Sequence, residues 1–312
     1  MFLLSLYSSF FPSPTNPKLY NSTNIRATLY QNGGSWIFNC YFFNLFHSNG
    51  AAVYYANCEI KLLIEDSIFF NCTTTGSGGA IYFSTTLGHI ALFKICGYRC
   101  GGPFDHGQFA IVYSNISLST NVNLTSFSYC SYFFSKQYSP LMLQRCSPLV
   151  SSINSSYNSL EYHCGLCFYQ SYSKICFSTV FSNFAEKGSC IRIFSGSSHI
   201  LCTNIVNNSF NGFSFYVIYQ ESNAFTNITN CNFIDNVPYL FRANNTMIIR
   251  ECWIQSNYIV SGSCSMSNIN QIQTFKLSHL HTFMCYSLNW LYSHPMNHIR
   301  NNSFIFIVMF IY

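Results

Sequence analysis

Residues 66–83 read DSIFFNCTTTGSGGAIYF. A short run of strand-forming residues ends at Asn71 and Cys72, a small glycine-rich segment follows, and a second apolar run begins at Ala80. Short runs of β-formers bounded by Asn and Gly are typical of strands joined by tight corners. The stretch therefore predicts two consecutive strands with a corner between them.

The glycine-rich segment is not a phosphate-binding loop. A P-loop requires Lys and then Ser or Thr directly after its last glycine, and a dinucleotide-binding fingerprint requires a following helix. Residues 80–83 read AIYF, with neither feature. Gly78 and Gly79 are instead expected to let the chain turn tightly and adjacent coils nest closely.

The first run belongs to a six-residue unit that recurs along the chain. Each copy starts with a small or polar residue, often Cys, continues with β-formers and mostly closes on Asn. The copies are NCYFFN (39–44), DSIFFN (66–71), CSYFFS (130–135), STVFSN (178–183), CTNIVN (202–207), CNFIDN (231–236) and CWIQSN (252–257). Successive copies start 27, 64, 48, 24, 29 and 21 residues apart, and the two large gaps are close to three and two of the smaller ones. The unit is therefore roughly 21 to 29 residues long, with degraded copies between residues 72 and 177. Such a period predicts a parallel β-solenoid, whose coils bury their apolar faces by stacking about 4.8 Å apart.

This solenoid predicts two ladders of stacked side chains. Asn tolerates the positive φ of a tight corner, and the closing residues are expected to form one amide ladder: Asn44, Asn71, Asn183, Asn207, Asn236 and Asn257. The alternative is that an Asn-rich chain places Asn after apolar runs by chance. Cys202, Cys231 and Cys252 are expected to stack as packed thiols or to include one bridge. Alternation in CNFIDN places Phe233 on one strand face and Cys231 and Asp235 on the other.

The composition favours an all-β fold. Of 312 residues, 49% are hydrophobic and 7% are charged, and strand and turn formers are enriched. The formal net charge of +5 comes from thinly spread Lys and Arg, so no nucleic-acid partner is indicated. Sixteen Cys favour secretion, as do nine Asn-x-Ser/Thr sequons against roughly six expected by chance. The sequons begin at Asn21, Asn71, Asn115, Asn123, Asn154, Asn207, Asn227, Asn244 and Asn301.

Two tetrapeptides carry a family resemblance. GGAI at residues 78–81 and FIDN at residues 233–236 resemble the paired GGA[ILV] and FxxN repeats of the chlamydial polymorphic outer membrane proteins. Similar repeats occur in predicted surface proteins of trichomonads. The resemblance implies a right-handed parallel β-helix of the pectin-lyase-like type, surface display and adhesion. Elsewhere the repeats drift: NGAAVY stands in place of GGAI, and VFSN, IFFN and IQSN in place of FxxN.

The same fold class suggests a carbohydrate-active enzyme as the alternative function. Polysaccharide cleavage needs clustered carboxylates. Superposed copies place Asp235 at Ser256 and Glu251 at Asn230, so these two acids do not stack. The adjacent Glu65 and Asp66 would point to opposite strand faces, and Asp105 with His106 is interpreted as a solvated corner. No catalytic residue is assigned.

Several Cys and His residues have spacings that resemble parts of metal sites. Cys164 and Cys167 beside His163, and Cys96 with Cys100, resemble halves of a zinc site, but disulfides or packed thiols are the preferred interpretation. The pairs His279 with His281 and His294 with His298 are interpreted as surface histidines. No metal and no cofactor is therefore assigned.

The predicted organisation is a leader or N-terminal cap at residues 1–29, a parallel β-helix at 30–275 and an irregular segment at 276–312. The apolar run at residues 304–312 is shorter than a membrane-spanning helix and is interpreted as the start of a truncated membrane anchor, with a terminal strand as the alternative. The expected function is non-enzymatic adhesion or ligand binding by a surface-displayed or secreted protein. Host-cell glycans or proteins are the expected partners.

Overall fold

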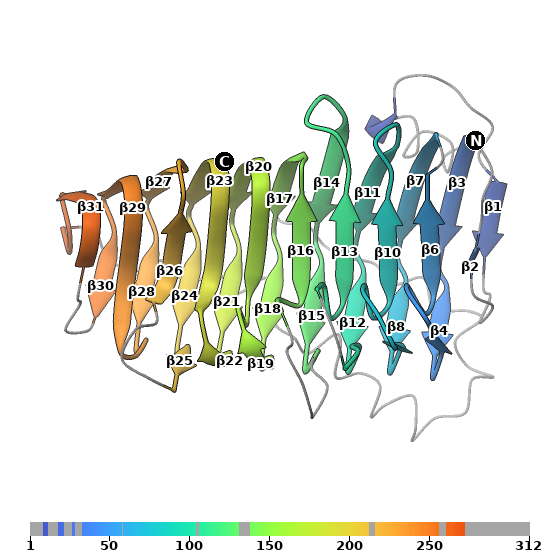
Figure 1. The fold of residues 1–312 in the computed structure, drawn as a ribbon, viewed down its shortest axis with the longest axis horizontal. Helices are drawn as coiled ribbons and strands as arrows, with labels where there is room; N and C mark the ends of the chain where they lie inside the picture. Colours follow the sequence, from blue (N-terminus) through green and yellow to red (C-terminus); the bar gives the residue numbers. More distant parts are fainter. Residues whose placement is uncertain are drawn as a thin grey trace.

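The chain forms an elongated parallel β-solenoid (Figure 1). The computed structural model describes residues 9–11, 18–21, 27–28, 33–57, 59–103, 106–130, 138–211, 216–255 and 260–271. Throughout these ranges the strands pair in parallel with the strand one coil away. The predicted all-β solenoid is confirmed.

One coil illustrates the path of the chain. Strand β10 (Ile81–Ser84) leads through a corner to β11 (His89–Phe93), and a second corner at Lys94 leads to β12 (Cys96–Tyr98). A third corner at Arg99 turns the chain back toward β13 (Ala110–Tyr113), which pairs with β10. Below, these are called the first, second and third strands of a coil.

The first and second strands of the coils form a 17-stranded sheet. First strands are β2 (Ala27–Thr28), β6 (Val53–Ala56), β10, β13, β16 (Leu141–Gln144) and β26 (Tyr216–Glu221). Second strands are β1 (Lys18–Asn21), β3 (Gly33–Phe38), β7 (Ile60–Glu65), β11, β14 (Ser119–Asn123), β17 (Ser147–Ser151) and β27 (Phe225–Thr229). Four strands span both positions: β20 (Leu166–Cys176), β23 (Ser189–Leu201), β29 (Tyr239–Arg250) and β31 (Val260–Ser267).

The third strands form a nine-stranded sheet. They are β4 (Tyr41–Phe43), β8 (Ile68–Phe70), β12, β15 (Ser126–Ser128), β18 (Asn154–Ser156), β21 (Thr179–Phe181), β24 (Asn204–Val206), β28 (Asn232–Ile234) and β30 (Trp253–Gln255). Small sheets follow the third corner: β19 (Ser159–Tyr162), β22 (Phe184–Lys187) and β25 (Ser209–Phe210), and β5 (Phe46–His47) with β9 (Thr73–Thr74). Strand β1 pairs with β3, so parallel pairing begins before the expected boundary at residue 30.

Two corners keep the same left-handed backbone conformation in coil after coil. Between the second and third strands, φ lies between 45° and 54° at Asn39, Asp66, Lys94, Leu124, Ser152, Phe177, Cys202, Asn230 and Glu251. After the third strand, φ lies between 49° and 54° at Asn44, Asn71, Arg99, Tyr129, Tyr157, Ser182, Asn207 and Asp235. Bulky residues rarely adopt this conformation. Here it is held by hydrogen bonds between coils, such as that from the Asn71 N–H to the Tyr98 carbonyl at 2.9 Å.

The core runs the length of the solenoid between the two large sheets. Alternate residues of each strand point inward, mainly Ile, Leu, Val and Phe. The rings of Phe42 and Phe69 stack with centroids 4.9 Å apart. The next coil has Gly97 at this register, because the ring of Phe109 fills the space: a Cβ at Gly97 would lie 2.3 Å from it. The missing side chain at Gly97 in one coil is thus compensated by the Phe109 ring of the next coil.

Candidate functional site

The predicted repeat copies fall into two registers that differ by one residue. Copies starting at residues 39, 66 and 202 begin on the second corner, whereas those starting at 178, 231 and 252 begin one residue after it. The copy at 130–135 lies outside the described residues except for Cys130, which follows the third strand β15 and its corner at Tyr129. The single predicted asparagine ladder is therefore wrong, because its members occupy two neighbouring columns.

The outer column lies on the third corner and is exposed. Asn44, Asn71 and Asn207 occupy it with positive φ, as expected for Asn at a tight corner. Asn71 Nδ2 donates to Asn44 Oδ1 at 2.7 Å, which is the expected amide-to-amide contact. Asn207 instead donates to the Ser182 hydroxyl oxygen at 2.8 Å.

The inner column is a buried asparagine ladder of Asn158, Asn183, Asn208 and Asn236. The Nδ2 of each of the first three donates to Oδ1 of the next at 2.9 to 3.0 Å. Each of those Oδ1 atoms also accepts a hydrogen bond from the backbone N–H of the same donor asparagine, one coil earlier in the ladder. The ladder satisfies polar groups inside the core, which would otherwise be costly to bury. Asn257 lies outside the described residues.

Thiols occupy the same inner column in earlier coils. Cys72, Cys100 and Cys130 are fully buried, and the Cys130 N–H donates to Asn158 Oδ1 at 2.9 Å. The pKa of Cys72 is raised by its hydrogen bond with Cys100 and by burial, and burial raises the pKa of Cys130. Cys72 and Cys130 are therefore packed as protonated thiols, which are poor nucleophiles.

The predicted cysteine column is correct for two of its three members. Cys231 and Cys252 lie side by side after the second corner, each with a free thiol bonded to the carbonyl two residues earlier. Cys202 lies on the corner itself, level with Asn230, so Thr203 takes the column position. Phe233 points inward as predicted for one face, with its ring centroid 4.8 Å from that of Phe241. Cys231 is also buried, because the corner turns its side chain inward.

Gly78 and Gly79 form the corner before a first strand. Gly78 has φ of 66° and is level with Gly50 and Gly107, both also at positive φ. A Cβ at Gly79 would lie 2.0 Å from the Gln108 carbonyl oxygen and 2.5 Å from the Gly101 nitrogen. This corner therefore requires glycine both for its conformation and for the close approach of the next coil.

The cysteine pairs with zinc-like spacing do not converge. Cys164 points into the core, whereas Cys167 packs outside the sheet against Ile111 and Met142. Cys96 is disulfide-bonded, and Cys100 belongs to the thiol column. In the part of the chain that the structure describes, no three His, Cys, Asp or Glu side chains are grouped to hold a metal. Residues 272–312, with the four C-terminal histidines considered above, lie outside that part, as does Asp105.

Three carboxylates are paired with cations on different coils. Lys94 lies 3.9 Å from Asp66, Lys187 lies 2.7 Å from Glu161, and Arg192 pairs with Glu221. Glu251 is level with Asn230, as the sequence predicted. Asp66, Glu161 and Glu221 are thus each paired with a cation. No two of these three carboxylates form an acid and base pair at one site.

Among the described carboxyl groups, Glu65 has the pKa that is shifted most. It lies on the outer face of β7 and is only 5% exposed. Burial and the neighbouring Asp66 raise its pKa to about 7, opposed by the Trp36 indole and Lys94. The Trp36 indole N–H donates to Glu65 Oε2 at 3.2 Å. Phe11 packs in the same outer cluster as Trp36.

A continuous ladder of aromatic rings runs along the outer face of the nine-stranded sheet. We call it the aromatic ladder, and its members are Phe43, Phe70, Tyr98, Tyr129, Tyr157 and Phe181. Successive centroids lie 4.9 to 5.6 Å apart. The rings are parallel except at two junctions, where the interplanar angle is 63° and 90°. Phe43 and Tyr129 are 39% and 36% exposed.

A column of polar side chains lies beside the aromatic ladder on the same sheet. The first residues of five consecutive third strands are Ser126, Asn154, Thr179, Asn204 and Asn232. Asn232 Nδ2 donates to Asn204 Oδ1 at 2.7 Å. Ser126, Thr179 and Asn204 are partly exposed, whereas Asn154 and Asn232 are each only 3% exposed. The column lies beside the aromatic ladder in the three coils that contribute Tyr129, Tyr157 and Phe181.

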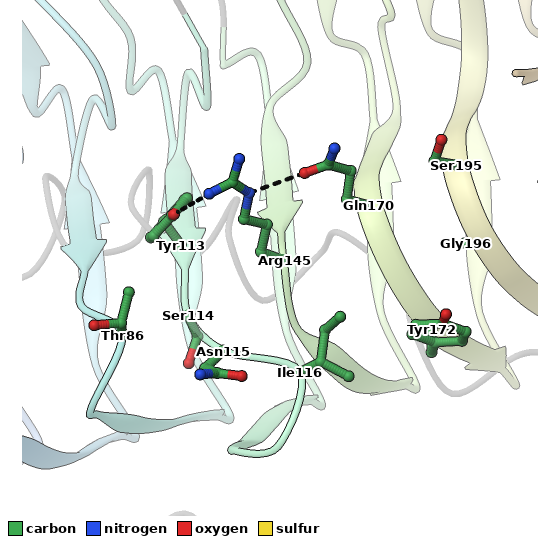
Figure 2. Close-up of a pocket in the computed structure, with 10 residues that line it drawn as sticks. All are labelled: Thr86, Tyr113, Ser114, Asn115, Ile116, Arg145, Gln170, Tyr172, Ser195 and Gly196. Carbon is green, nitrogen blue, oxygen red and sulfur yellow. Dashed lines mark hydrogen bonds between the residues drawn. The ribbon is translucent and has the colours of Figure 1, made fainter.

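A pocket of about 500 Å³ lies at the first corner of the middle coils (Figure 2). Tyr113, Arg145 and Gln170, from three successive coils, lie side by side along it. The Arg145 guanidinium donates from Nη1 to the Tyr113 hydroxyl at 2.7 Å and from Nε to Gln170 Oε1 at 2.9 Å. Ile116 and Tyr172 lie on the opposite side of the pocket in this view.

The 23 Tyr, 32 Phe and 3 Trp of the sequence predict exposed rows of Tyr on a flank of the solenoid, suited to carbohydrate stacking or protein contact. The sequence did not identify the members of the aromatic ladder, and it did not predict the Arg145 pocket. Half of the ladder comes from Tyr98, Tyr129 and Tyr157, in the interval where the repeat copies appeared degraded. The regular recurrence of an aromatic residue near the third corner was the signal that could have found them. The pocket depends on differing corner lengths, which carry no signal before the coils are aligned.

No protein-family model, no curated protein and no solved structure matches the chain. The described residues include no helix that is long and apolar enough to cross a bilayer. The class that the fold defines is a parallel β-solenoid with an aromatic outer face.

Proposed function

We propose that this chain is a non-enzymatic β-solenoid, surface-displayed or secreted, that adheres to a glycan through the aromatic ladder. The observation that carries the proposal is the run of six outward rings, of which Tyr129, Tyr157 and Phe181 lie beside a column of Ser, Thr and Asn side chains. Aromatic rings offer apolar contact area, and neighbouring amides and hydroxyls supply hydrogen bonds. Sugars present both kinds of surface.

The resemblance to the chlamydial and trichomonad repeats supports the cellular location. The level positions of Gly50, Gly78 and Gly107 strengthen the likeness of the GGAI corner to a true repeat. In this proposal the coils wind right-handed, as in pectin-lyase-like β-helices. Four sequon asparagines are also exposed, namely Asn71, Asn115, Asn207 and Asn244, where attached sugar is compatible with the fold.

The location is tested on intact cells that express the full chain. Surface protease should shave the protein, and a glycosidase should shift its electrophoretic mobility. A protein that is protected from protease and unshifted on intact cells would contradict the surface proposal.

The ligand is tested with two matched variants on a glycan array and on host cells. Tyr129→Ser removes a ladder ring at a corner with φ of 53°, and Phe177→Ser removes a 50% exposed ring at a corner with φ of 50° outside the ladder. We expect Tyr129→Ser to weaken glycan binding and Phe177→Ser to leave it unchanged. Equal effects of both variants, or binding that survives removal of all cell-surface glycans, would argue against a glycan-binding ladder.

A further inference from the structure

We infer that the pocket around Arg145 binds a sugar that carries a carboxylate, such as a uronate or a sialate. The pocket lies at the first corner of the coil, whereas the aromatic ladder follows the third strands. The two sites are therefore separate, and this inference adds a second binding site with a defined ligand chemistry to the proposed function.

Within the described part of the chain, Arg145 forms no ion pair. The pairs of Lys94 with Asp66, Lys187 with Glu161 and Arg192 with Glu221 use other cations. No Asp or Glu is among the residues that line the pocket. In a chain with only 7% charged residues, an unpaired guanidinium on a concave surface is the natural partner for an anion.

The guanidinium is held in place and still has donors to offer. Its two hydrogen bonds, to Tyr113 and Gln170, fix its orientation from both sides. Arg has five N–H donors, so both hydrogens on Nη2 and one on Nη1 are not used by these bonds. Adjacent donors on two nitrogens match the two oxygens of a carboxylate. A rigid, partly satisfied Arg loses little freedom when it binds.

The concavity follows from unequal corner lengths in neighbouring coils. Residues 114–118 connect β13 to β14 and project as a loop near the top of the molecule (Figure 1). In the next coil only Arg145 and Cys146 connect β16 to β17, and then β20 and β23 run straight through the corner. The long loop therefore forms a wall beside short corners. Its position is fixed by the bond from the Ser147 hydroxyl to the Ile116 carbonyl at 3.0 Å.

The rest of the lining suits a sugar ring. Tyr172 is 55% exposed and Ile116 is 46% exposed, so both offer apolar contact to a ligand. Asn115 and Ser195 place an amide and a hydroxyl group in the same lining, whereas the buried Ser114 hydroxyl donates to the Gly88 carbonyl at 3.0 Å. The volume of about 500 Å³ lies within the roughly 300–1,000 Å³ typical of small-molecule sites. One fixed cation, an aromatic ring and several neutral polar groups favour a singly charged sugar over a bare inorganic anion.

The test uses the full chain from a host that does not glycosylate, because Asn115 is both a sequon and a lining residue. The probes are 3′-sialyllactose and digalacturonate, compared by titration calorimetry at low salt with lactose and with the dimethyl ester of digalacturonate. We expect at least one acidic probe to bind, its neutral counterpart to bind at least tenfold more weakly, and added salt to weaken the acidic probe.

Three variants assign the binding to the pocket. Arg145→Gln removes the charge at the site, and Arg250→Gln makes the same change at an exposed position on a distant coil. We expect Arg145→Gln to weaken the acidic probe by roughly 10- to 100-fold, and Arg250→Gln to leave it unchanged. Tyr172→Ala should weaken acidic and neutral sugars alike. Circular dichroism and thermal unfolding confirm that each variant is folded.

Several results would overturn the inference. They are the absence of binding by both acidic probes, equal binding of acids and esters, and equal loss in Arg145→Gln and Arg250→Gln. Competition by inorganic phosphate at the same concentration as the sugar would show a general anion site instead. Tyr129→Ser should retain binding of these probes, so a failure of the aromatic-ladder proposal and a failure of this one are distinguishable.

Discussion

The side-chain amide of Asn183 donates to Oδ1 of Asn208 at 3.0 Å, and the Asn183 backbone N–H donates to the same oxygen at 3.0 Å. The second hydrogen of Asn183 Nδ2 bonds the Ser155 carbonyl at 2.9 Å. One buried side chain thus links three successive coils. Because the bonds repeat from coil to coil, each asparagine both supports and depends on its neighbours.

Asn183→Ala is expected to lower the free energy of unfolding by about 2–4 kcal/mol, because it removes the buried acceptor of the Asn158 backbone N–H and of one Asn158 Nδ2 hydrogen. Asn245→Ala, at an exposed position in β29, should change it by less than about 0.5 kcal/mol. Urea unfolding of the two variants checks the difference. Similar costs at both positions would show that the buried ladder contributes little.

Gly97→Ala is expected to destabilise the fold by about 1–3 kcal/mol, because its new Cβ would overlap the Phe109 ring. In a Phe109→Leu background the same change should cost at least about 1 kcal/mol less, since the smaller side chain leaves room. A double-mutant cycle measured by urea unfolding gives the coupling. Strict additivity would mean that the two positions do not share volume.

Glu65 is expected to make stability depend on pH. Its pKa is raised from 4.5 to about 7 in the folded chain, so the folded state holds a proton that the unfolded chain releases. This contribution to stability is fully present below about pH 4.5 and is lost as pH rises through about 7. Glu65→Gln keeps an acceptor for the Trp36 indole and removes the titration.

The measurement for Glu65 is the urea midpoint of both proteins at several pH values from 4 to 8. The difference between them should change across the window between the two pKa values and be constant above it. A constant difference throughout would show that Glu65 titrates normally. Trp36 fluorescence offers a second readout, because its indole contacts the titrating carboxyl group.

The sequons are expected to differ in occupancy when the chain passes through a glycosylating secretory pathway. Asn115 and Asn244 are exposed, whereas Asn154 is 3% exposed within the nine-stranded sheet. Glycopeptide mass spectrometry of folded, secreted protein should find sugar at the first two and none at Asn154. Sugar at Asn154 in folded protein would contradict the burial of that side chain.

Much of the fold could be predicted from the sequence because the solenoid repeats a short chemical pattern. The run at residues 66–71 and the GGAI corner each correspond to a real structural unit, and Asn44 with Asn71 form the expected contact. The register was the harder problem. A one-residue offset separates Asn207 from Asn208, and sequence letters alone could not show which of two adjacent asparagines points inward.

The candidate sites depend on relations between coils that a linear pattern does not contain. Tyr98 and Tyr129 occupy different positions relative to the third corner, yet their ring centroids are 5.4 Å apart. Arg145 became a candidate only when Tyr113 and Gln170 were placed on either side of it. Such neighbours are separated by a full coil of chain, so their contacts follow from the stacking and not from local spacing.

The corner between the second and third strands is two residues long in every described coil, from Asn39 and Cys40 to Glu251 and Cys252. The other connections vary, and at the first corner they range from two residues at 145–146 to five residues at 114–118. The second corner therefore has a fixed length along the solenoid, whereas the first corner and the connection after the third strand accept extra residues. Foreign peptides inserted at those two positions should be displayed without disturbing the coils. Insertions at the second corner should be avoided, because its length is the same in every described coil.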